Sequence, residues 1–493
     1  MPCFPVIFGR RKVQSQASSQ HKTLTYSKAV MSTSHALPPS RRGRRNVQPD
    51  LMIDLSRRVE QDQYHPSKNP KGIIDLGSAV NELMLEDIAI WTRWNLKKGE
   101  LKDGLGYNDT QGSPELLKAA ADFMNEHFNT RIPLTSDNIL VANGATTLLD
   151  TLTYNIADEG DSILLPTPSY GMFAHDISTR NQVRLVEVPC DDIPDDRFTG
   201  QPTGNGDGAR QCEIVARLED AIERELSQGR KVAGVLLANP ENPLGRCYSA
   251  HVLLQISQLC SKYKVHLVVD EIYAMTGDNF SSMLSLGLDT NFRNVHVLWG
   301  MSKDFGLGGL RIGFLATYNQ EIHDTMRTLS MFGWVSSYSA TIAAKLLSDK
   351  KYFRDHYTPT FNRRLKKRRI LVEGELEKYD IPYMRADSGF FMFVDLSDWM
   401  DLLFAQHGKD DELELLEHLM ENGVFLEPGK AFFARTPGWF RLSFGAEKHT
   451  VKTGLQRLFR CLRALDGKLD PLGVADLTPY LPPYRQMAHI VAV

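Results

Sequence analysis

The chain has 493 residues, of which 42% are hydrophobic and 24% are charged. This length allows two or three domains, and the composition is that of an ordinary soluble globular protein. The six cysteines form no CxxC pair, which argues against a disulfide framework or a zinc site and favours a reducing compartment; they are Cys3, Cys190, Cys212, Cys247, Cys260 and Cys461. No run of about 18 apolar residues occurs, so the sequence predicts no transmembrane helix.

Charge is unevenly distributed along the chain. Residues 1–49 contain nine Lys and Arg and no acid; subtracting these nine from 57 leaves 48 basic against 60 acidic residues in the remainder. An acid-free, Ser- and Arg-rich leader is typical of a mitochondrial transit peptide. Because no clear amphipathic helix emerges, we favour a disordered leader over residues 1–50. The expected location is the cytoplasm, with mitochondria as the alternative, and Met31 offers a second translation start.

Apolar runs alternate with helical patterns through the middle of the chain. Helical patterns cover 146–156, 216–226 and 250–263, and strands are predicted at 139–142, 162–166, 183–188, 232–238, 266–269, 295–299 and 312–316. Such alternation indicates βαβ units and a mostly parallel sheet covered on both faces. We therefore predict an α/β large domain over residues 106–338, with ligands collecting at the carboxyl ends of its strands.

The pattern changes after residue 338. A long basic helix is expected over 352–379, another helix over 411–422 and a strand over 439–444. These elements predict a smaller α+β domain over residues 339–465, completed by residues 51–105. Residues 466–493 contain Pro471, Pro479, Pro482 and Pro483 and are expected to form an extension.

Lys303 lies between two apolar strands, just before a glycine-rich turn. Burying an unpaired ammonium is costly, and burial lowers the pKa of a lysine so that its amine becomes a nucleophile toward carbonyls. The position therefore suggests a Schiff-base lysine, and hence pyridoxal phosphate. The alternative is a non-catalytic protein that keeps the fold of such an enzyme.

Other polar residues follow the predicted strands. Small residues at 143–147, including Ala145 and Thr146, begin a helix whose free N–H groups can hold a phosphate. Tyr170 could stack on a heteroaromatic ring or be a core tyrosine. Asn242 lies in a rigid Pro-rich turn, where its amide could meet a phenolic oxygen. Asp270 could pair with a pyridinium nitrogen, with a helix N-cap as the alternative.

Two arginines complete the candidate site. Arg311 follows Gly306, Gly308 and Gly309, and its planar guanidinium could neutralise a phosphate. Arg441 alternates with apolar residues on a predicted strand, where it is either a surface-facing residue or a bidentate partner for a substrate carboxylate. The histidines show no metal-ligand spacing, so no metal site is predicted.

The stretch Ser302-Lys303-Asp304-Phe305-Gly306-Leu307-Gly308-Gly309-Leu310-Arg311-Ile312-Gly313 resembles the fold-type I pyridoxal-phosphate enzymes of the class I/II aminotransferase family, specifically the branch of the 1-aminocyclopropane-1-carboxylate synthases. The similarity runs from about residue 74 to residue 462. It implies a three-layer large domain, a smaller domain and a homodimer with a shared active site. We expect an amino acid and a 2-oxo acid as substrates. No nucleic-acid or membrane partner is expected, because the basic leader has no interleaved aromatic residues and the chain has no long apolar run.

The resemblance also implies a role for each site residue. Lys303 would bind the cofactor and shuttle protons, and Asp270 would hold the pyridine nitrogen. The remaining expected cofactor ligands are Tyr273 and Asn242 at the ring oxygen, Tyr170 stacked on the ring, Ala145, Thr146 and Arg311 at the phosphate, and Tyr107 from a partner subunit. Lys303, Asp270 and Tyr273 would be the catalytic residues, and Arg441 would bind the substrate carboxylate.

Two departures from the family pattern affect the expected chemistry. The family usually has a hydroxyl residue three positions before the lysine, where this chain has Gly300, so one phosphate hydrogen bond is missing or is supplied by Ser302. The cyclopropane-forming synthases carry a glutamate where this chain has Val80, and Glu82 lies two residues further on. We therefore predict an aminotransferase with a role in specialised metabolism, and a carbon–sulfur or other β/γ-eliminating lyase is the alternative.

Overall fold

The computed structural model describes residues 39–45, 50–193, 212–277, 279–287, 292–407 and 412–467. The chain divides into two compact units, Met1–Gln48 and Pro49–Val493. In the first, the described residues include helix α1 (Arg41–Arg45). Most of the predicted leader and nearly all of the predicted extension at 466–493 lie outside the described residues.

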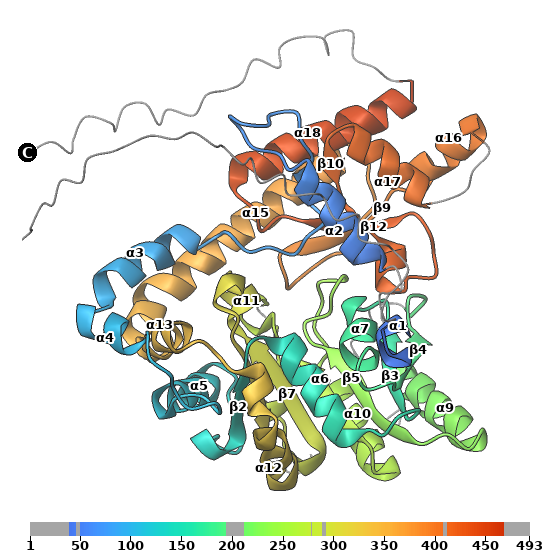
Figure 1. Ribbon diagram of the computed structural model, residues 1–493. Helices are drawn as coiled ribbons and strands as arrows, with labels where there is room; N and C mark the ends of the chain where they lie inside the picture. The colour runs from blue at the N-terminus through green and yellow to red at the C-terminus, as the bar shows by residue number, and fades with distance from the viewer. Residues whose placement is uncertain are drawn as a thin grey trace, which may run out of the picture. The chain divides into compact units, whose positions relative to one another are not determined.

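A seven-stranded sheet forms the centre of the second unit (Figure 1), in the order β2-β8-β7-β6-β5-β3-β4. Strand β8 is antiparallel to both of its neighbours, and the other neighbouring strands are parallel. The mostly parallel α/β sheet predicted from the sequence is thus confirmed. Its strands are β2 (Ile139–Ala142), β3 (Ser162–Thr167), β4 (Arg184–Pro189), β5 (Val232–Ala238), β6 (His266–Asp270), β7 (Val295–Gly300) and β8 (Gly313–Thr317).

Side chains along these strands alternate between two apolar clusters. In β8, Phe314 and Ala316 belong to the larger cluster, whereas Leu315 between them belongs to the smaller one. Successive strand residues point to opposite faces, so the two clusters cover opposite faces of the sheet. Helices α5, α9 and α10 contribute to the larger cluster, and α6, α7 and α12 to the smaller one. This two-sided burial explains why the strands are continuous apolar runs.

The structure has a helix wherever the sequence predicts one, and the observed limits are close to the predicted ones. The longest, α15, continues a π-helical turn (Phe353–Tyr357), so the predicted helix 352–379 is nearly continuous. The helices are α2 (Leu51–Gln61), α3 (Leu85–Asn95), α4 (Lys98–Asp103), α5 (Pro114–His127), α6 (Ala145–Ile156), α7 (Met172–Ser178), α9 (Glu213–Ser227), α10 (Ala250–Tyr263), α11 (Met301–Asp304), α12 (Gln320–Thr328), α13 (Ser337–Ser348), α14 (Lys350–Tyr352), α15 (Thr358–Lys378), α16 (Ser397–His407), α17 (Glu412–Glu421) and α18 (Lys448–Leu465).

Two small sheets lie outside the large one. The first has the order β11-β12-β9, from β11 (Glu427–Pro428), β12 (Trp439–Ser443) and β9 (Phe391–Asp395), all antiparallel. In the second, β1 (Ile74–Asp75) pairs in parallel with β10 (Val424–Phe425). This pairing joins the segment after α2 to the C-terminal part of the chain. The boundaries expected for the smaller domain, 51–105 and 339–465, remain a prediction.

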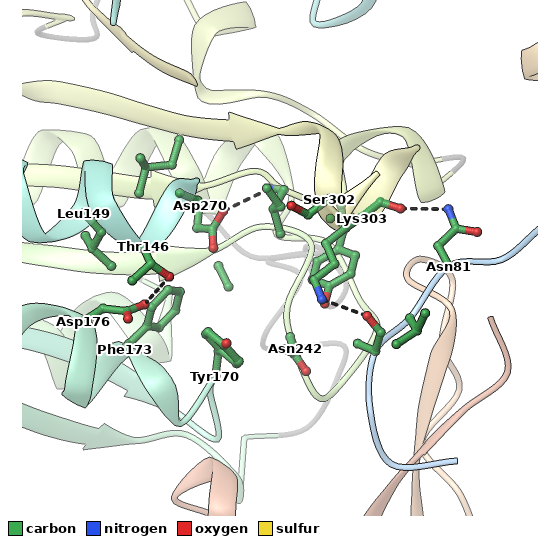
Figure 2. Close-up of a pocket in the computed structure, with 18 of the residues that line it drawn as sticks. Asn81, Thr146, Leu149, Tyr170, Phe173, Asp176, Asn242, Asp270, Ser302 and Lys303 are labelled. Atoms are coloured by element: carbon green, nitrogen blue, oxygen red, sulfur yellow. Dashed lines mark hydrogen bonds between the residues drawn. The ribbon is translucent and has the colours of Figure 1, made fainter. Parts of the chain in front are cut away.

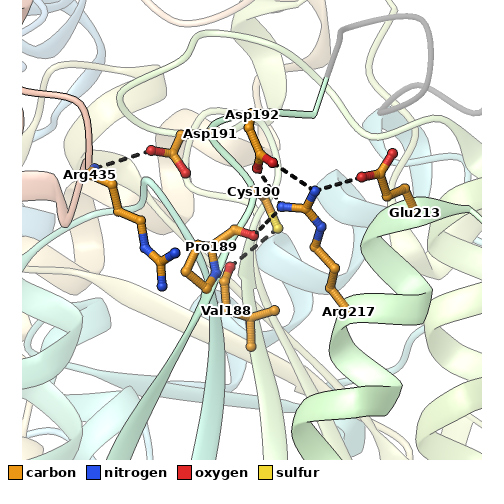
Figure 3. A network of polar contacts seen from close by, with 8 residues as sticks. All are labelled: Val188, Pro189, Cys190, Asp191, Asp192, Glu213, Arg217 and Arg435. Carbon is orange, nitrogen blue, oxygen red and sulfur yellow. Dashed lines mark hydrogen bonds and ion pairs between the residues drawn. The ribbon is translucent and has the colours of Figure 1, made fainter.

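A polar network fastens the end of β4 to its surroundings (Figure 3). Arg217 of α9 donates to the Pro189 carbonyl at 2.7 Å and to Glu213 at 2.6 Å, and it also pairs with Asp192. The Arg435 backbone N–H donates to Asp191 at 3.2 Å. The network therefore links the large sheet to the loop before β12.

A buried carboxylate ties the starts of β3 and β5 to α9. Glu225 accepts hydrogen bonds from Arg230 at 2.6 and 2.7 Å and from Ser162 at 2.7 Å, and its side chain is 3% exposed. The hydrogen bonds from Arg230 lower the pKa of Glu225 to about 2. The ionised form therefore stabilises the fold above the ordinary pKa of 4.5, and this contribution is lost as the pH falls toward 2.

We expect Glu225→Gln to lower the free energy of unfolding by roughly 2 kcal/mol at pH 7, because Arg230 loses a charged partner. The difference from the wild type should shrink below pH 4.5, where unfolded Glu225 binds a proton. Urea denaturation of the variant and the wild type, at pH 7 and at a pH below 4.5, measures this difference in the free energy of unfolding. The exposed Glu159, changed to Gln, is the control, and an equal loss in this control would contradict the assignment.

Candidate active site

A cavity of about 520 Å³ opens at the carboxyl ends of the parallel strands, where the sequence places its candidate residues (Figure 2). Strands β2, β3, β5, β6 and β7 all end at this edge, and β8 begins there. Eight of the predicted residues line the cavity, namely Ala145, Thr146, Tyr170, Asn242, Asp270, Tyr273, Lys303 and Arg311. The fold therefore gathers residues that are up to 166 positions apart in the sequence.

Lys303 projects into the cavity from α11, the short helix directly after β7. Its Nζ donates to the Ala79 carbonyl at 2.8 Å. Burial and, to a smaller extent, the charge of Arg441 lower the pKa of Lys303 to about 8, while Asp270 acts in the opposite direction. Roughly a tenth of the amine is therefore neutral at pH 7, and this neutral form is the one that nucleophilic attack and proton transfer require.

The backbone that carries Lys303 is held on several sides. The Asn81 side-chain amide donates to the Lys303 carbonyl at 2.8 Å, and the Tyr357 hydroxyl donates to the Asp304 carbonyl at 2.6 Å. The Asp304 carboxylate accepts from Trp299 Nε1 at 2.8 Å. Asn81 was not predicted as a site residue, because no local motif indicates a contact across 222 positions.

Asp270 ends β6 and faces the cavity across from Lys303 (Figure 2). Its Oδ1 accepts from the Ile272 backbone N–H at 3.1 Å, but no α-helix follows directly, so the N-cap alternative is wrong. Burial raises the pKa of Asp270 to about 7. Within the described part of the chain, Asp270 forms no ion pair; a cationic ring nitrogen would supply the missing charge.

A second buried carboxyl group, Asp176, lies in the same cavity and was not predicted. Burial and, to a smaller extent, the nearby Asp270 raise its pKa to about 7. The hydroxyl of Thr146 donates to Asp176 at 3.5 Å, a long hydrogen bond. Only the fold brings α7 beside the start of α6, so no sequence pattern signals this contact.

The predicted phosphate end of the cavity is formed by the start of α6 and by Arg311. Gly144 precedes α6 with a φ of 126°, and a Cβ there would lie 2.5 Å from Arg311 Nη2. The glycine therefore allows the guanidinium to lie beside Gly144, next to the start of α6, where the first helical N–H groups are free. A positive helix terminus beside an arginine is a suitable cradle for a phosphate.

Gly300 has a packing role that the family resemblance did not predict. It faces Gly313 across β7 and β8, and a Cβ on Gly300 would lie 2.9 Å from the Ile312 carbonyl oxygen and 3.2 Å from Gly313 Cα. A hydroxyl side chain at this position would therefore clash with backbone. Ser302 lines the cavity and is the hydroxyl residue of α11 available to a phosphate.

Aromatic and amide side chains shape the middle of the cavity. Tyr273 is buried and packs edge-on against Phe390 and Phe391, with ring centroids 5.5 and 5.2 Å away. Tyr170 lines the wall opposite Asn242, and burial raises the pKa of both tyrosines, which keeps their hydroxyls protonated. Both can therefore donate hydrogen bonds while their rings limit water access.

Arg441 lies in an adjoining cavity of about 480 Å³, which shares Lys303, Tyr273 and Asn242 with the first. It is 3% exposed, so the surface-facing alternative is wrong. Its guanidinium donates to Asn242 Oδ1 at 2.8 Å and to the Gly77 carbonyl at 3.0 and 2.7 Å. This adjoining cavity, the entrance cavity, is also lined by Met52, Ile53, Ser56, Arg57 and Glu60 of α2.

Tyr107 does not line either cavity of its own chain and is 95% exposed. Its ring stacks on Trp334, with centroids 5.3 Å apart. The expectation that it completes the site of a partner subunit remains a prediction.

Val80 lines both cavities, where it presents an apolar side chain. Glu82 turns elsewhere: its carboxylate accepts from the Glu447 backbone N–H at 2.7 Å, and it lines a separate surface cavity with Arg364 and Arg368. Glu82 therefore does not take the place of the glutamate that the cyclopropane-forming synthases carry at the position of Val80. Among the residues that the structure describes, no group of His, Cys, Asp and Glu is arranged to hold a metal ion, and none of the helices combines the length and apolar character needed to span a membrane.

The cavity's donors fit pyridoxal phosphate at each end. An anion cradle lies at the start of α6, a buried carboxyl group that forms no ion pair among the described residues lies at the end of β6, and an amine of lowered pKa lies between strands. The fold and the site thus define a pyridoxal-phosphate-dependent enzyme with the fold-type I architecture. Residues 71–458 match the family described as aminotransferase class I and II, and the chain belongs to this family.

Several named proteins are similar over most of the chain. The human 1-aminocyclopropane-1-carboxylate synthase-like protein 1 is 31% identical over 415 residues, covering 82% of this chain and 79% of that protein. The tomato (Solanum lycopersicum) 1-aminocyclopropane-1-carboxylate synthase 2 is 31% identical over 420 residues, covering 81% and 82%. Aspartate aminotransferase from Thermus thermophilus with maleate shares the fold, with a TM-score of 0.70, 20% identity, and coverage of 86% and 100%.

We expect Gly300→Ser to weaken cofactor binding and lower the melting temperature, because its Cβ would displace the Ile312 carbonyl rather than add a phosphate ligand. Ser302→Ala should weaken cofactor binding by about tenfold without a comparable stability loss, since it removes one hydrogen bond to an anion. Equilibrium dialysis against pyridoxal phosphate and thermal unfolding measure the two effects. Tighter binding by Gly300→Ser would contradict this account.

Proposed function

We propose that the protein is an aminotransferase that transfers the amino group of an amino acid to a 2-oxo acid. The proposal rests on one observation: Lys303 and Asp270 lie in the same cavity, and the side chain that lines both this cavity and the entrance cavity beside them is the apolar Val80. Lys303 and Asp270 support removal of a proton from Cα of a bound amino acid. Val80 provides no acid or base of the kind that the cyclopropane-forming synthases carry at this position.

Each residue contributes a separate part of the proposed reaction. Pyridoxal phosphate, when bound, withdraws electrons from the substrate Cα and so acidifies its proton. Arg441 holds the substrate carboxylate and thereby orients Cα toward Lys303, whose neutral amine takes the proton as a general base. Lys303 Nζ would hold this proton and release it again, as transamination requires. Tyr170, Tyr273 and Val80 line the cavities and limit the access of water to the substrate Cα and to Lys303.

The alternative is a lyase that expels a β or γ leaving group. It is supported by the names of similar proteins, since the tomato relative is a 1-aminocyclopropane-1-carboxylate synthase. The same Lys303 could perform the first proton transfer in both reactions. The two functions therefore differ only after that transfer, and a measurement of products must separate them.

A homodimer with shared active sites is part of the proposal. The segments around Tyr107 and Phe332 expose large apolar side chains, including Leu105 and Met331, and Trp94 of α3 is also exposed. The Ser337 hydroxyl donates to the Gly106 carbonyl at 2.6 Å, so these exposed segments are held together. Apolar surface of this kind is typical of a subunit interface.

We expect single turnover with excess amino acid and no 2-oxo acid to leave the amine form of the cofactor on the enzyme. The amino group stays on the cofactor in a transferase, and the accompanying product is a 2-oxo acid. Stopped-flow absorbance and an ammonia assay measure the outcome. Continuous release of ammonia without a co-substrate would overturn transamination in favour of the lyase, and no cofactor absorbance at all would favour a non-catalytic protein.

We expect Lys303→Ala and Tyr107→Ala to be nearly inactive alone and to recover activity when mixed after subunit exchange. In a mixed dimer one site receives both intact residues, so recovery should approach about a quarter of wild-type activity. The control mixes Lys303→Ala with Asp270→Ala, whose residues belong to the same subunit's site. Every site in that control lacks one of the two residues and should stay inactive. Equal activities of the two mixtures would contradict the assignment of Tyr107 to the partner's site.

A further inference from the structure

A buried glutamate faces the proposed carboxylate-binding arginine. Glu427 and Arg441 are directly opposite residues on the antiparallel strands β11 and β12, so their side chains lie on the same face of that sheet. Glu427 Oε2 lies 3.8 Å from Arg441 Nη2, and both side chains are 3% exposed. A carboxylate therefore already occupies the immediate surroundings of the group that a substrate carboxylate would approach.

Arg441 is held in place but retains binding capacity. Its guanidinium lies 4.6 Å from the centre of the Phe432 ring and 5.6 Å from that of Phe391. Three of its five N–H groups donate to Gly77 and Asn242, which leaves two for a carboxylate. The 3.8 Å separation from Glu427 is too long for a hydrogen bond, so that contact does not use them.

The second oxygen of Glu427 has no partner. Among the described residues, Oε1 is buried and forms no hydrogen bond, and Glu427 lines the entrance cavity beside Arg441 and Lys303. A buried carboxylate oxygen without a donor is costly while it is charged. Either a proton on Glu427 or a group entering the cavity removes that cost.

Burial, more than the surrounding charges, favours the protonated form of Glu427. Of those charges, Arg441 has the largest effect and favours the ionised form, whereas Asp75 of β1 and Asp50 at the start of α2 act to keep Glu427 neutral. Arg57 and Glu60 of α2 and the amine of Lys303 line the same cavity. Burial is the largest effect and raises the pKa of Glu427 to about 7. Glu427 can therefore change its charge near neutral pH.

We propose that Glu427 is a specificity-determining residue that must be protonated when Arg441 holds a substrate carboxylate, so that the carboxylate binds together with one proton. The proposal rests on the proposed function, which assigns the substrate carboxylate to Arg441. When Glu427 is ionised, it offsets the charge of Arg441 and repels a second carboxylate, because both side chains are only 3% exposed and their charges are weakly screened. When Glu427 is neutral, Arg441 presents its full charge, and the Glu427 hydroxyl can donate to the bound carboxylate.

Propionate is a suitable probe, because it has a carboxylate but no amino group to react. Its binding to the cofactor-loaded enzyme is measured from the rise in melting temperature with propionate concentration, against chloride at equal ionic strength and at each pH. We expect the wild-type dissociation constant to rise about tenfold from pH 6.5 to 8.5, as for loss of one linked proton. Glu427→Gln should stay near the low-pH affinity and change by less than about twofold.

Three variants separate the possible outcomes. Glu60→Gln removes an exposed carboxylate from the same cavity and should keep the wild-type pH dependence. Arg441→Gln should abolish the propionate effect; if it does not, the carboxylate site of the proposed function is wrong. If Arg441→Gln abolishes binding but Glu427→Gln keeps the wild-type pH dependence, or binds propionate more weakly at pH 8.5, the role of Glu427 is overturned while the proposed function stands.

Discussion

The site depends on a balance of charges among buried side chains. Burial shifts the pKa of both Lys303 and Asp270, and the charge of Arg441 also lowers the pKa of Lys303. Burial makes the amine of Lys303 easier to deprotonate and the carboxyl of Asp270 harder to ionise. A phosphorylated, nitrogen-containing cofactor brings complementary charges to both ends of this cavity. The fold thus holds charged groups whose unfavourable burial is relieved when the cofactor binds.

The parts of this arrangement that sequence could predict are those attached to strand ends. Asn242, Asp270 and Lys303 each follow an apolar run, and parallel strands bring their carboxyl ends to one edge whatever the connecting lengths are. Strand limits were within one or two residues, because glycine and proline interrupt the apolar runs. Arg311 was predictable for the same reason, since β8 begins at the edge where β7 ends.

The parts that could not be predicted depend on contacts between distant segments. Asn81 holds the backbone of Lys303 from a loop 222 positions earlier, and Asp176 enters the cavity through the packing of α7 beside α6. Neither belongs to a periodic pattern. The sequence shows only that Gly300 lacks the hydroxyl usual at this position. A glycine is needed there because β8 lies close to it, and only the distances between the two strands show this.

Asp270 and Glu427 are similarly buried, but the ligands of the site favour opposite charge states of these two carboxyl groups. Both carboxyl groups have a pKa raised to about 7, and each lies near a cation, Lys303 or Arg441. A bound cofactor would add positive charge beside Asp270 and favour its ionised form, whereas a bound substrate carboxylate would add negative charge beside Glu427 and favour its neutral form. Successive binding of cofactor and substrate therefore drives the two carboxyl groups in opposite directions. The net charge of the cavity changes less than the charges of the ligands alone would require, and this limits the cost of burying them.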